Sequence, residues 1–351
     1  MKAILDTQYK EIPCKTVLGN FGILGTRFWT SYSFDPYTNC GVNCVYCNSC
    51  AINYDGSRHS PVYIKTNAPQ ILAKELTWFK RKGVLRMGIW ADPYQPAEKK
   101  YRITEQILRV LEDHKFPFAI GTKSDLILRD LDLISEASKK THCCAALSLS
   151  TLDEKMAKLL EPNAPSPKRR LEVVKKLSES GVTTGVWLAP IFPHWTDTTE
   201  DIGRVVEAAV ENGAKFVAGA VFDMRNPAQS KLFLKDHFVE LVPKYERMYA
   251  IDRPCHYPDD DFYLHGLAKK FISECQTHKI EMFLPHFSTR RQAWSFYLQN
   301  LFKLDESPFV WLTQLLSYLY PYQEMLQTVQ IKFGKSSASK SFLKVFRYFP
   351  H

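Results

Sequence analysis

Short apolar runs alternate with amphipathic segments of helical spacing between residues 85 and 223, and this alternation restricts the fold more than any other feature of the chain. Five apolar runs begin 27 to 40 residues apart, which is the length of one strand, one helix and two loops. They predict strands over 85–91, 116–122, 143–150, 183–191 and 216–223. The gaps between them predict helices over 104–114, 129–140, 167–180 and 198–212. Continuously apolar strands separated by helices indicate a parallel sheet covered by helices on both faces.

The same pattern extends toward the N-terminus and fades toward the C-terminus. A strand over 28–34 and a helix over 69–82 complete six βα units, so we expect an α/β fold whose parallel sheet is either open or curled into a barrel. After residue 223, helices are expected over 237–247, 260–278 and 290–302, and residues 281–284 have the pattern of one more strand. The predicted parts are an N-terminal segment (1–27), a (βα)6 domain (28–223), a mainly helical C-terminal extension (224–330) and a tail (331–351).

The composition is that of an ordinary globular protein, since 45% of the 351 residues are hydrophobic and 24% are charged. The longest apolar runs, such as residues 216–222, are far shorter than the roughly 20 residues that span a bilayer, so no membrane partner is expected. The first residues lack the apolar stretch of a secretion signal, which predicts a cytoplasmic protein. In that reducing compartment the nine cysteines are expected to be thiols.

The net charge of +9 is concentrated in the tail, which carries five cations and no acid. The cations Lys332, Lys335, Lys340, Lys344 and Arg347 are interleaved with the aromatic residues Phe333, Phe342, Phe346, Tyr348 and Phe349. Positive charges beside stacking rings suit single-stranded nucleic acid. A solvated helix face whose aromatic residues pack on the protein fits the same pattern. A nucleic-acid partner is therefore one of two interpretations of the tail.

Four of the nine cysteines, Cys40, Cys44, Cys47 and Cys50, lie within eleven residues, which indicates a metal site. The first three have the spacing C-x3-C-x2-C, and three thiolates can bind three irons of a cubane cluster while the fourth iron stays open to a ligand. The alternative is zinc, which needs four ligands in a closed structural site, with Cys50 as the fourth. A zinc site would make the chain a nucleic-acid-binding module without catalysis, whereas a three-cysteine cluster leaves Cys50 as a free thiol.

The cysteine spacing, with the aromatic Tyr46 just before the third cysteine, resembles the radical S-adenosylmethionine (SAM) superfamily. Other blocks resemble the group of that superfamily related to spore photoproduct lyase: FDPYTNC (34–40), ADPYQPAE (91–98), GTKS (121–124), LEPNAPSP (160–167), LAPIFP (188–193) and FVELVPKYER (238–247). The resemblance implies a partial (βα)6 TIM-like barrel with parallel strands. It also implies a [4Fe–4S] cluster on Cys40, Cys44 and Cys47, S-adenosylmethionine as the second cofactor, and Tyr46 among the cofactor-binding residues.

In this superfamily the amino and carboxylate groups of S-adenosylmethionine chelate the open iron, and one electron cleaves the cofactor to methionine and a 5′-deoxyadenosyl radical. The resemblance therefore implies an enzyme of the lyase or transferase type, with an electron donor of the flavodoxin or ferredoxin type and a substrate that the sequence does not identify. Spore photoproduct lyase itself uses a cysteine downstream of the cluster as hydrogen donor. Residues 84–123 contain no cysteine, and the next one after Cys50 is Cys143, which argues against thymine-dimer repair by that mechanism.

Polar residues follow the predicted strands at their carboxyl ends, where such folds bind ligands. Asp92 can accept a hydrogen bond from the cofactor ammonium, or it can be a turn residue that caps the next helix. Lys123 can pair with the cofactor carboxylate, or it can be a solvated loop lysine. Ser148 and Ser150 point to the same side because they are two residues apart. They can bind a ribose hydroxyl, or they can make ordinary hydrogen bonds at the strand end.

Other residues with reactive side chains are further from this edge of the sheet or lie in loops. Cys143 and Cys144 begin the strand over 143–150, at the end opposite the candidate site, and are expected to be core thiols. Loop residues that can line a substrate pocket are His194, Trp195, Cys255, His256 and Tyr257. Because a loop histidine is more often structural than catalytic, the sequence assigns no catalytic residue.

Overall fold

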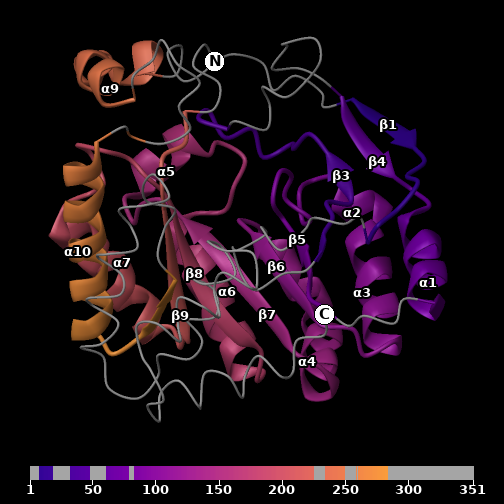
Figure 1. The fold of residues 1–351 in the computed structure, drawn as a ribbon. Helices are drawn as coiled ribbons and strands as arrows, with labels where there is room; N and C mark the ends of the chain where they lie inside the picture. The colour runs from indigo at the N-terminus through magenta and orange to yellow at the C-terminus, as the bar shows by residue number, and fades with distance from the viewer. Residues whose placement is uncertain are drawn as a thin grey trace, which may run out of the picture. The chain divides into compact units, whose positions relative to one another are not determined.

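The computed structural model describes residues 8–18, 32–47, 61–78, 83–224, 234–249, 258 and 260–283. All of these belong to one compact unit of the chain, residues 1–20 and 30–288, whereas the second unit, residues 21–29 and 289–351, lies outside the described ranges. The described residues contain a seven-stranded sheet in the order β10-β9-β8-β7-β6-β5-β2, and each neighbouring pair of strands is parallel (Figure 1). The prediction of a parallel α/β sheet is confirmed.

The central strands of this sheet are covered on both faces. The strands are β2 (Tyr32–Ser33), β5 (Leu85–Met87), β6 (Phe118–Thr122), β7 (Cys143–Leu149), β8 (Thr183–Ile191), β9 (Phe216–Val221) and β10 (Glu281–Phe283). Every residue of β6, β7 and β9 is buried, as expected for strands of a parallel sheet with helices on its faces. Cys143 and Cys144 are buried at the start of β7, which confirms that they are core thiols.

Helices follow most of the strands where the apolar spacing predicts them, and the structure adds two short helices, over residues 98–101 and 154–160, that were not predicted. The helices are α1 (Ala68–Trp78), α2 (Glu98–Tyr101), α3 (Ile103–Asp113), α4 (Leu131–Lys140), α5 (Glu154–Leu160), α6 (Pro167–Glu179), α7 (Thr199–Glu211), α9 (Val242–Met248) and α10 (Asp261–Thr277), with short 3-10 turns at Asp125–Asp130 and Val239–Leu241. Side-chain caps set several starts: Ser166 Oγ accepts the Arg169 N–H at the start of α6, and Thr198 Oγ1 accepts the Asp201 N–H at the start of α7.

The second strand of the sheet is shorter than predicted. The sequence predicts a strand over 85–91, but β5 ends at Met87. The backbone of residues 88–91 leaves the sheet to surround the carboxylate of Asp35, which accepts four N–H groups, from Gly88, Ile89, Trp90 and Ala91, at 2.7 to 3.2 Å. Asp35 lies in the segment that follows β2, so a side chain outside the strands accepts the N–H groups that the apolar run would have used in ladder bonds. The predicted strand over 28–34 is described only as β2, because residues 28–31 lie outside the described ranges.

A second, small sheet lies beside the start of the main one and is absent from the sequence prediction. Its middle strand β4 (Val62–Lys65) pairs in parallel with β1 (Tyr9–Ile12) and antiparallel with β3 (Tyr37–Thr38) (Figure 1). These strands are too short to show a clear period in the sequence. Because β3 ends two residues before Cys40, the small sheet is the point from which the cysteine loop leaves.

The main sheet includes a strand beyond residue 224. This strand, β10, lies where the sequence predicts one over 281–284. β10 pairs in parallel with β9, and α10 packs against α7. The contact between these helices is close at Gly203, where an added Cβ would lie 2.5 Å from a carboxylate oxygen of Glu274. Residues 261–283 therefore extend the same layered α/β arrangement. The proposed boundary at residue 224 and the basic tail stay predictions, and the helix expected over 290–302 lies outside the described residues.

Candidate functional site

The loop that carries Cys40, Cys44 and Cys47 is held by side chains from distant segments. The Gln95 amide bridges it, because Oε1 accepts the Gly41 N–H at 2.9 Å and Nε2 donates to the Asn39 carbonyl at 2.9 Å. Asn163 Nδ2 donates to the Gly41 carbonyl at 3.1 Å. Within the loop, Asn39 and Asn43 adopt positive φ angles of 66° and 55°, which asparagine tolerates better than most residues. The path of the loop is thus set by Gln95 and Asn163 more than by its own residues.

The three thiols of the loop lie in one environment. Burial raises the pKa of the Cys40 thiol to about 12, with a further contribution from the negative charge of Asp92. Burial also raises the pKa of Cys44 well above its usual value, while the nearby Lys123 ammonium acts in the opposite direction. Among the described residues, no three His, Cys, Asp or Glu side chains already converge on one point. Thiols with raised pKa values would have to lose their protons before they could bind a metal.

Asp92 lies at the carboxyl end of β5, as the sequence predicts, and links two strand ends. Its Oδ1 accepts the Tyr94 N–H at 2.9 Å and the Thr122 hydroxyl at 2.6 Å, and its Oδ2 accepts the Lys123 N–H at 2.8 Å. It does not cap α2, whose N-cap residue is Ala97. Burial raises the pKa of Asp92, although these hydrogen bonds oppose the shift. Because a carboxylate has about four acceptor sites, one acceptor position is left for a further donor.

Lys123 and Ser148 meet across the ends of β6 and β7. The Lys123 ammonium donates to Ser148 Oγ at 2.7 Å and lies 3.6 Å from Glu161 Oε1, and Ser148 Oγ donates to the Ala189 carbonyl at 3.1 Å. Ser150 differs, since its buried hydroxyl has no hydrogen-bond partner among the described residues. Ser150 also lines a small cavity of about 160 Å³ between β7, β8 and α7. Of the two serines, Ser150 is the one with hydrogen-bonding capacity to spare.

The structure adds Glu161 and Arg170, which the sequence analysis assigned no role. Tyr46 donates its hydroxyl proton to Glu161 Oε1, and Arg170 Nη2 lies 2.5 Å from Glu161 Oε2. Arg170 is 1% exposed and also donates to the Ser148 carbonyl at 2.8 Å. Burial favours the neutral acid, but Lys123 and Arg170 hold the pKa of Glu161 below its usual value. This buried group ties Tyr46 in the cysteine loop to the ends of β6 and β7.

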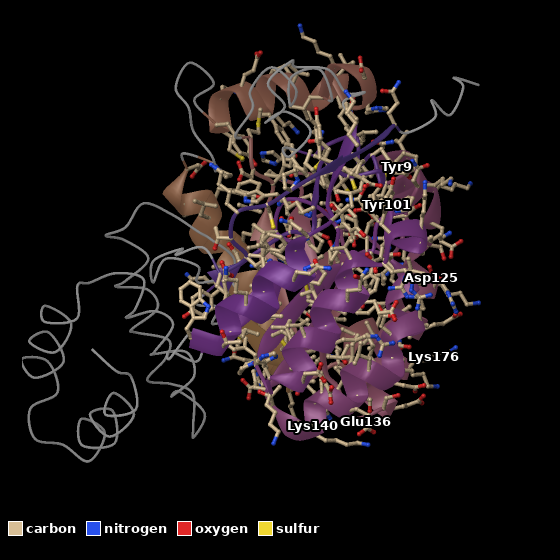
Figure 2. The ribbon with its side chains drawn as sticks, turned by 90° about the vertical axis from the view of Figure 1, so that its right-hand side faces the viewer. Tyr9, Tyr101, Asp125, Glu136, Lys140 and Lys176 are labelled. Carbon is tan, nitrogen blue, oxygen red and sulfur yellow. The ribbon has the colours of Figure 1, made fainter. Side chains whose placement is uncertain are left out.

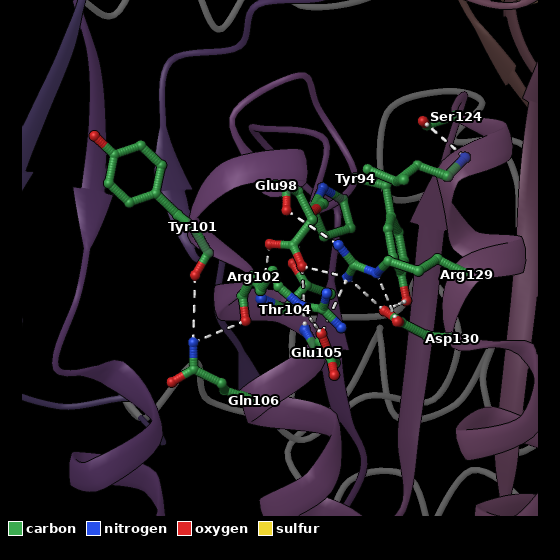
Figure 3. Close-up of polar contacts among 12 residues, drawn as sticks. Tyr94, Glu98, Tyr101, Arg102, Thr104, Glu105, Gln106, Ser124, Arg129 and Asp130 are labelled. Atoms are coloured by element: carbon green, nitrogen blue, oxygen red, sulfur yellow. Dashed lines mark hydrogen bonds and ion pairs between the residues drawn. The ribbon is translucent and has the colours of Figure 1, made fainter.

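A second charged cluster supports the loop that carries Asp92 and Gln95 (Figure 3). Glu98 is fully buried and accepts hydrogen bonds from the Tyr37 hydroxyl, the Thr104 N–H at 3.0 Å and Arg129 Nη2 at 2.7 Å. Arg129 also pairs with Asp130 at 2.7 Å, and Asp130 accepts the Tyr94 hydroxyl at 3.0 Å. Residues 91–98 are therefore held in place at both Tyr94 and Glu98.

The structure describes two of the remaining predicted pocket residues, His194 and Trp195. Trp195 packs against Phe192 and Phe238, with ring centroids 5.1 and 4.2 Å apart, and so belongs to the aromatic layer under α9. It also lines the small cavity beside Ser150. His194 is exposed, and its ring contacts Tyr263 at 5.9 Å. Cys50, Cys255, His256, Tyr257 and the whole basic tail lie outside the described residues, so their expected roles stay predictions.

Comparison with protein families decides the class of this site. The model of the Radical SAM superfamily matches residues 35–217, which is more than half of the chain and includes the cysteine loop and the strand ends described above. The chain belongs to the Radical SAM superfamily. Its fold and its resemblance to that superfamily are thereby confirmed, and the cofactors of the superfamily are a [4Fe–4S] cluster and S-adenosylmethionine. Of the helices that the structure describes, none is both long enough and apolar enough to span a bilayer.

Two proteins and two solved structures illustrate what the chain is similar to. An uncharacterised protein of Mycobacterium tuberculosis is 28% identical over 255 residues, 69% of this chain and 73% of its own length. An uncharacterised protein of Methanocaldococcus jannaschii is 31% identical over 176 residues, 49% of this chain and 65% of its own. A tyrosine-to-phenylalanine variant of spore photoproduct lyase has a similar structure, with a TM-score of 0.62 at 13% identity, over 80% of this chain and 82% of that one. Another variant of that enzyme, with bound AdoMet and dinucleoside spore photoproduct, has a TM-score of 0.59 at 14% identity. The match covers 75% of this chain and 78% of that one. The likeness confirms the partial-barrel fold.

Proposed function

We propose that this radical SAM enzyme holds its [4Fe–4S] cluster on Cys40, Cys44 and Cys47 and binds S-adenosylmethionine at the carboxyl ends of β5, β6 and β7. The main support is that Gln95, in the same segment as Asp92, is hydrogen-bonded to the three-cysteine loop, while Asp92 accepts the Lys123 N–H and Lys123 donates to Ser148. When bound and reduced, the cluster supplies one electron that cleaves S-adenosylmethionine to a 5′-deoxyadenosyl radical, which abstracts hydrogen from a substrate.

The residues of this chain bind and orient the cofactor. Asp92 has one acceptor position left, which accepts a hydrogen bond from the cofactor ammonium. Lys123, held by Ser148, donates to the cofactor carboxylate. The hydroxyl of Ser150, which has no partner among the described residues, bonds a ribose hydroxyl. Tyr46, fixed by Glu161, orients the loop between the second and third cysteines. Removal of the Asp92 carboxylate in Asp92→Ala weakens cofactor binding about 10- to 100-fold, because a hydrogen bond to a charged group contributes about 1.5–3 kcal/mol.

Iron and sulfide content after anaerobic reconstitution tests the cluster assignment. Cys40→Ala, Cys44→Ala and Cys47→Ala each lose the cluster, whereas Cys50→Ala, the matched control, keeps it and still forms 5′-deoxyadenosine when reduced with dithionite. A colourless protein that binds one zinc per chain and loses it in Cys50→Ala would support the four-cysteine zinc module instead.

A nucleic acid is the substrate class that we propose, on the support of the basic charge and of the fold shared with spore photoproduct lyase. Five tail cations that contact phosphates of a single strand contribute about −0.7 × 5, or −3.5, to the slope of log affinity against log salt. Truncation after Gln330 therefore makes that slope shallower by this amount. Equal binding and equal salt dependence in the truncated and full-length proteins would contradict a role of the tail in this interaction.

A further inference from the structure

A second hollow lies beside the cysteine loop and shares Lys123 with the proposed cofactor site. It has a volume of about 630 Å³, and the backbone of Gly41 and Val42 forms part of its wall. Its rim comes from α2, from the start of the 3-10 turn after β6, from α5 and from the turn that follows α5. Gly41 directly follows Cys40, so a molecule in this hollow is one residue away from a proposed cluster ligand.

The charge of the hollow is positive. Lys99, Lys123 and Lys158 line it, and the side chains of Lys99 and Lys158 are exposed. Among the described lining residues the one acid is Asp125, whose carboxylate pairs with Arg169 Nε at 2.9 Å. Figure 2 shows Asp125 on the same side of the molecule as Tyr9, another lining residue, and Tyr101, whose ring contacts Tyr9 at 5.9 Å. An anion or an acidic surface is attracted to this side, with an enhancement that depends on salt.

The chemistry of the lining favours a protein over a small ligand. Sites that select a small anion present buried polar groups that the ligand completes, but no lining residue of this hollow is among the described buried side chains that lack a partner. The walls are instead formed by Pro96, Pro162, Ala164 and Pro165. Exposed lysines around an uncharged wall suit a small, transient interface that is guided by charge.

We propose that this basic hollow, lined by Lys99 and Lys158, is the docking surface for an acidic one-electron donor protein of the flavodoxin or ferredoxin type. The proposal rests on the assignment of the cluster to Cys40, Cys44 and Cys47. The donor is oxidised by one electron and the cluster is reduced by one, and no atom or proton is transferred between them. The electron enters through the Gly41 side of the loop, while the cofactor is bound at the strand ends.

The test compares two reductants on the reconstituted enzyme. Formation of 5′-deoxyadenosine is measured with limiting reduced flavodoxin and, separately, with excess dithionite, which needs no docking surface. In Lys99→Glu/Lys158→Glu, the flavodoxin-driven rate at low salt falls at least about tenfold, because electrostatic guidance raises association rates by about 10- to 1,000-fold. The dithionite-driven rate is unchanged. Added salt lowers the flavodoxin-driven rate of the wild type and removes most of its advantage over the variant.

Lys175→Glu/Lys176→Glu is the matched control. It makes the same charge change at exposed positions of α6, and Figure 2 shows Lys176 toward the other end of the molecule from Tyr9. Equal flavodoxin-driven rates in the two double variants would overturn the proposal. If the glutamate variant also lost dithionite-driven activity, Lys99→Gln/Lys158→Gln would decide, since it removes two charges without adding acids. A wild type that forms no 5′-deoxyadenosine with dithionite would contradict the proposed function itself.

Discussion

Two clusters of buried charge lie on either side of the loop that carries Asp92, and they differ in how fully their groups are paired. In the Glu98 cluster, Glu98, Arg129 and Asp130 each have close partners, at distances up to 3.1 Å (Figure 3). In the Glu161 cluster, Glu161 and Arg170 are paired closely, but Lys123 lies 3.6 Å from Glu161, too far for a hydrogen bond. The Ser150 hydroxyl next to it has no partner among the described residues.

This difference indicates that the Glu98 cluster supports the fold, whereas the Glu161 cluster can take part in ligand binding. A saturated cluster has nothing left to offer a ligand, so its contribution is to the fold. A cluster whose ammonium bonds a serine hydroxyl but lies beyond hydrogen-bond distance of its carboxylate bears the cost of incomplete pairing, which a ligand can relieve. Both clusters contain buried ions, so burial alone does not distinguish them. We expect changes in the Glu98 cluster to affect stability alone and changes in the Glu161 cluster to affect cofactor binding.

The largest effect is expected at Glu98. Glu98→Ala leaves the partly buried Arg129 without its carboxylate partner on α2, and breaking a buried pair in this way costs about 3–5 kcal/mol of stability. Urea denaturation of the reconstituted protein measures the loss. The control is Glu136→Ala, which removes an exposed pair with Lys139 and costs less than about 1 kcal/mol. A similar, small cost for both variants would mean that the Glu98 cluster does not support the fold.

A smaller effect, on binding instead of folding, is expected at Lys123. Lys123→Met removes the ammonium proposed for the cofactor carboxylate, and Glu161 keeps its close pair with Arg170. Affinity for S-adenosylmethionine falls about 10- to 100-fold, measured by equilibrium dialysis on the clustered protein. The matched control is Lys158→Met, at a lysine outside the cofactor site. Wild-type affinity in Lys123→Met would make Lys123 a structural residue, like Arg129.

At Ser150, stability and affinity for S-adenosylmethionine are expected to change in opposite directions. Ser150→Ala removes a buried hydroxyl without a partner among the described residues, so stability stays equal or rises by about 1 kcal/mol. Affinity for S-adenosylmethionine falls by about 0.5–1.5 kcal/mol, or roughly 2- to 10-fold. Ser148→Ala is the comparison, since loss of that hydroxyl leaves Lys123 and the Ala189 carbonyl short of a partner and lowers stability. A loss of stability in Ser150→Ala would show that its hydroxyl is already paired.

The smallest effect is a pH dependence at the edge of the Glu98 cluster. Hydrogen bonds from Arg102 and, at 2.8 Å, Arg109 lower the pKa of Glu105 to about 2. Because the pKa is lower in the folded state, the stabilisation is present above the unfolded value of about 4.3 and is lost as pH falls toward 2. Both arginines are more than half exposed, so salt screens the pair and the effect stays below about 1 kcal/mol. Urea midpoints of the wild type and Glu105→Gln at pH 5 and pH 3 should converge as the pH falls.

The sequence by itself determined the parallel sheet, the order of its strands in the chain and the three-cysteine loop. Each of these depends on residues that are close in the sequence: an apolar run, a helical period, or the C-x3-C-x2-C spacing. It also indicated Asp92, Lys123, Ser148 and Ser150 as candidate binding residues, because the carboxyl ends of parallel strands meet at one edge of a sheet. The sequence did not predict the short strands of the second sheet, because two to four residues are too few to show an alternation of apolar and polar side chains.

Only the tertiary structure decided which groups complete the site and which are saturated. Gln95, Glu161 and Asn163 reach the cysteine loop from positions 54, 115 and 122 residues away in the sequence. Ser148 and Ser150 look alike in the sequence, yet one hydroxyl is bonded to Lys123 and the other has no partner among the described residues. The end of β5 at Met87 likewise depends on the carboxylate of Asp35, 52 residues earlier in the chain. A hydrogen bond depends on where two atoms meet after the chain has folded, and the spacing of residues along the sequence carries no record of that meeting.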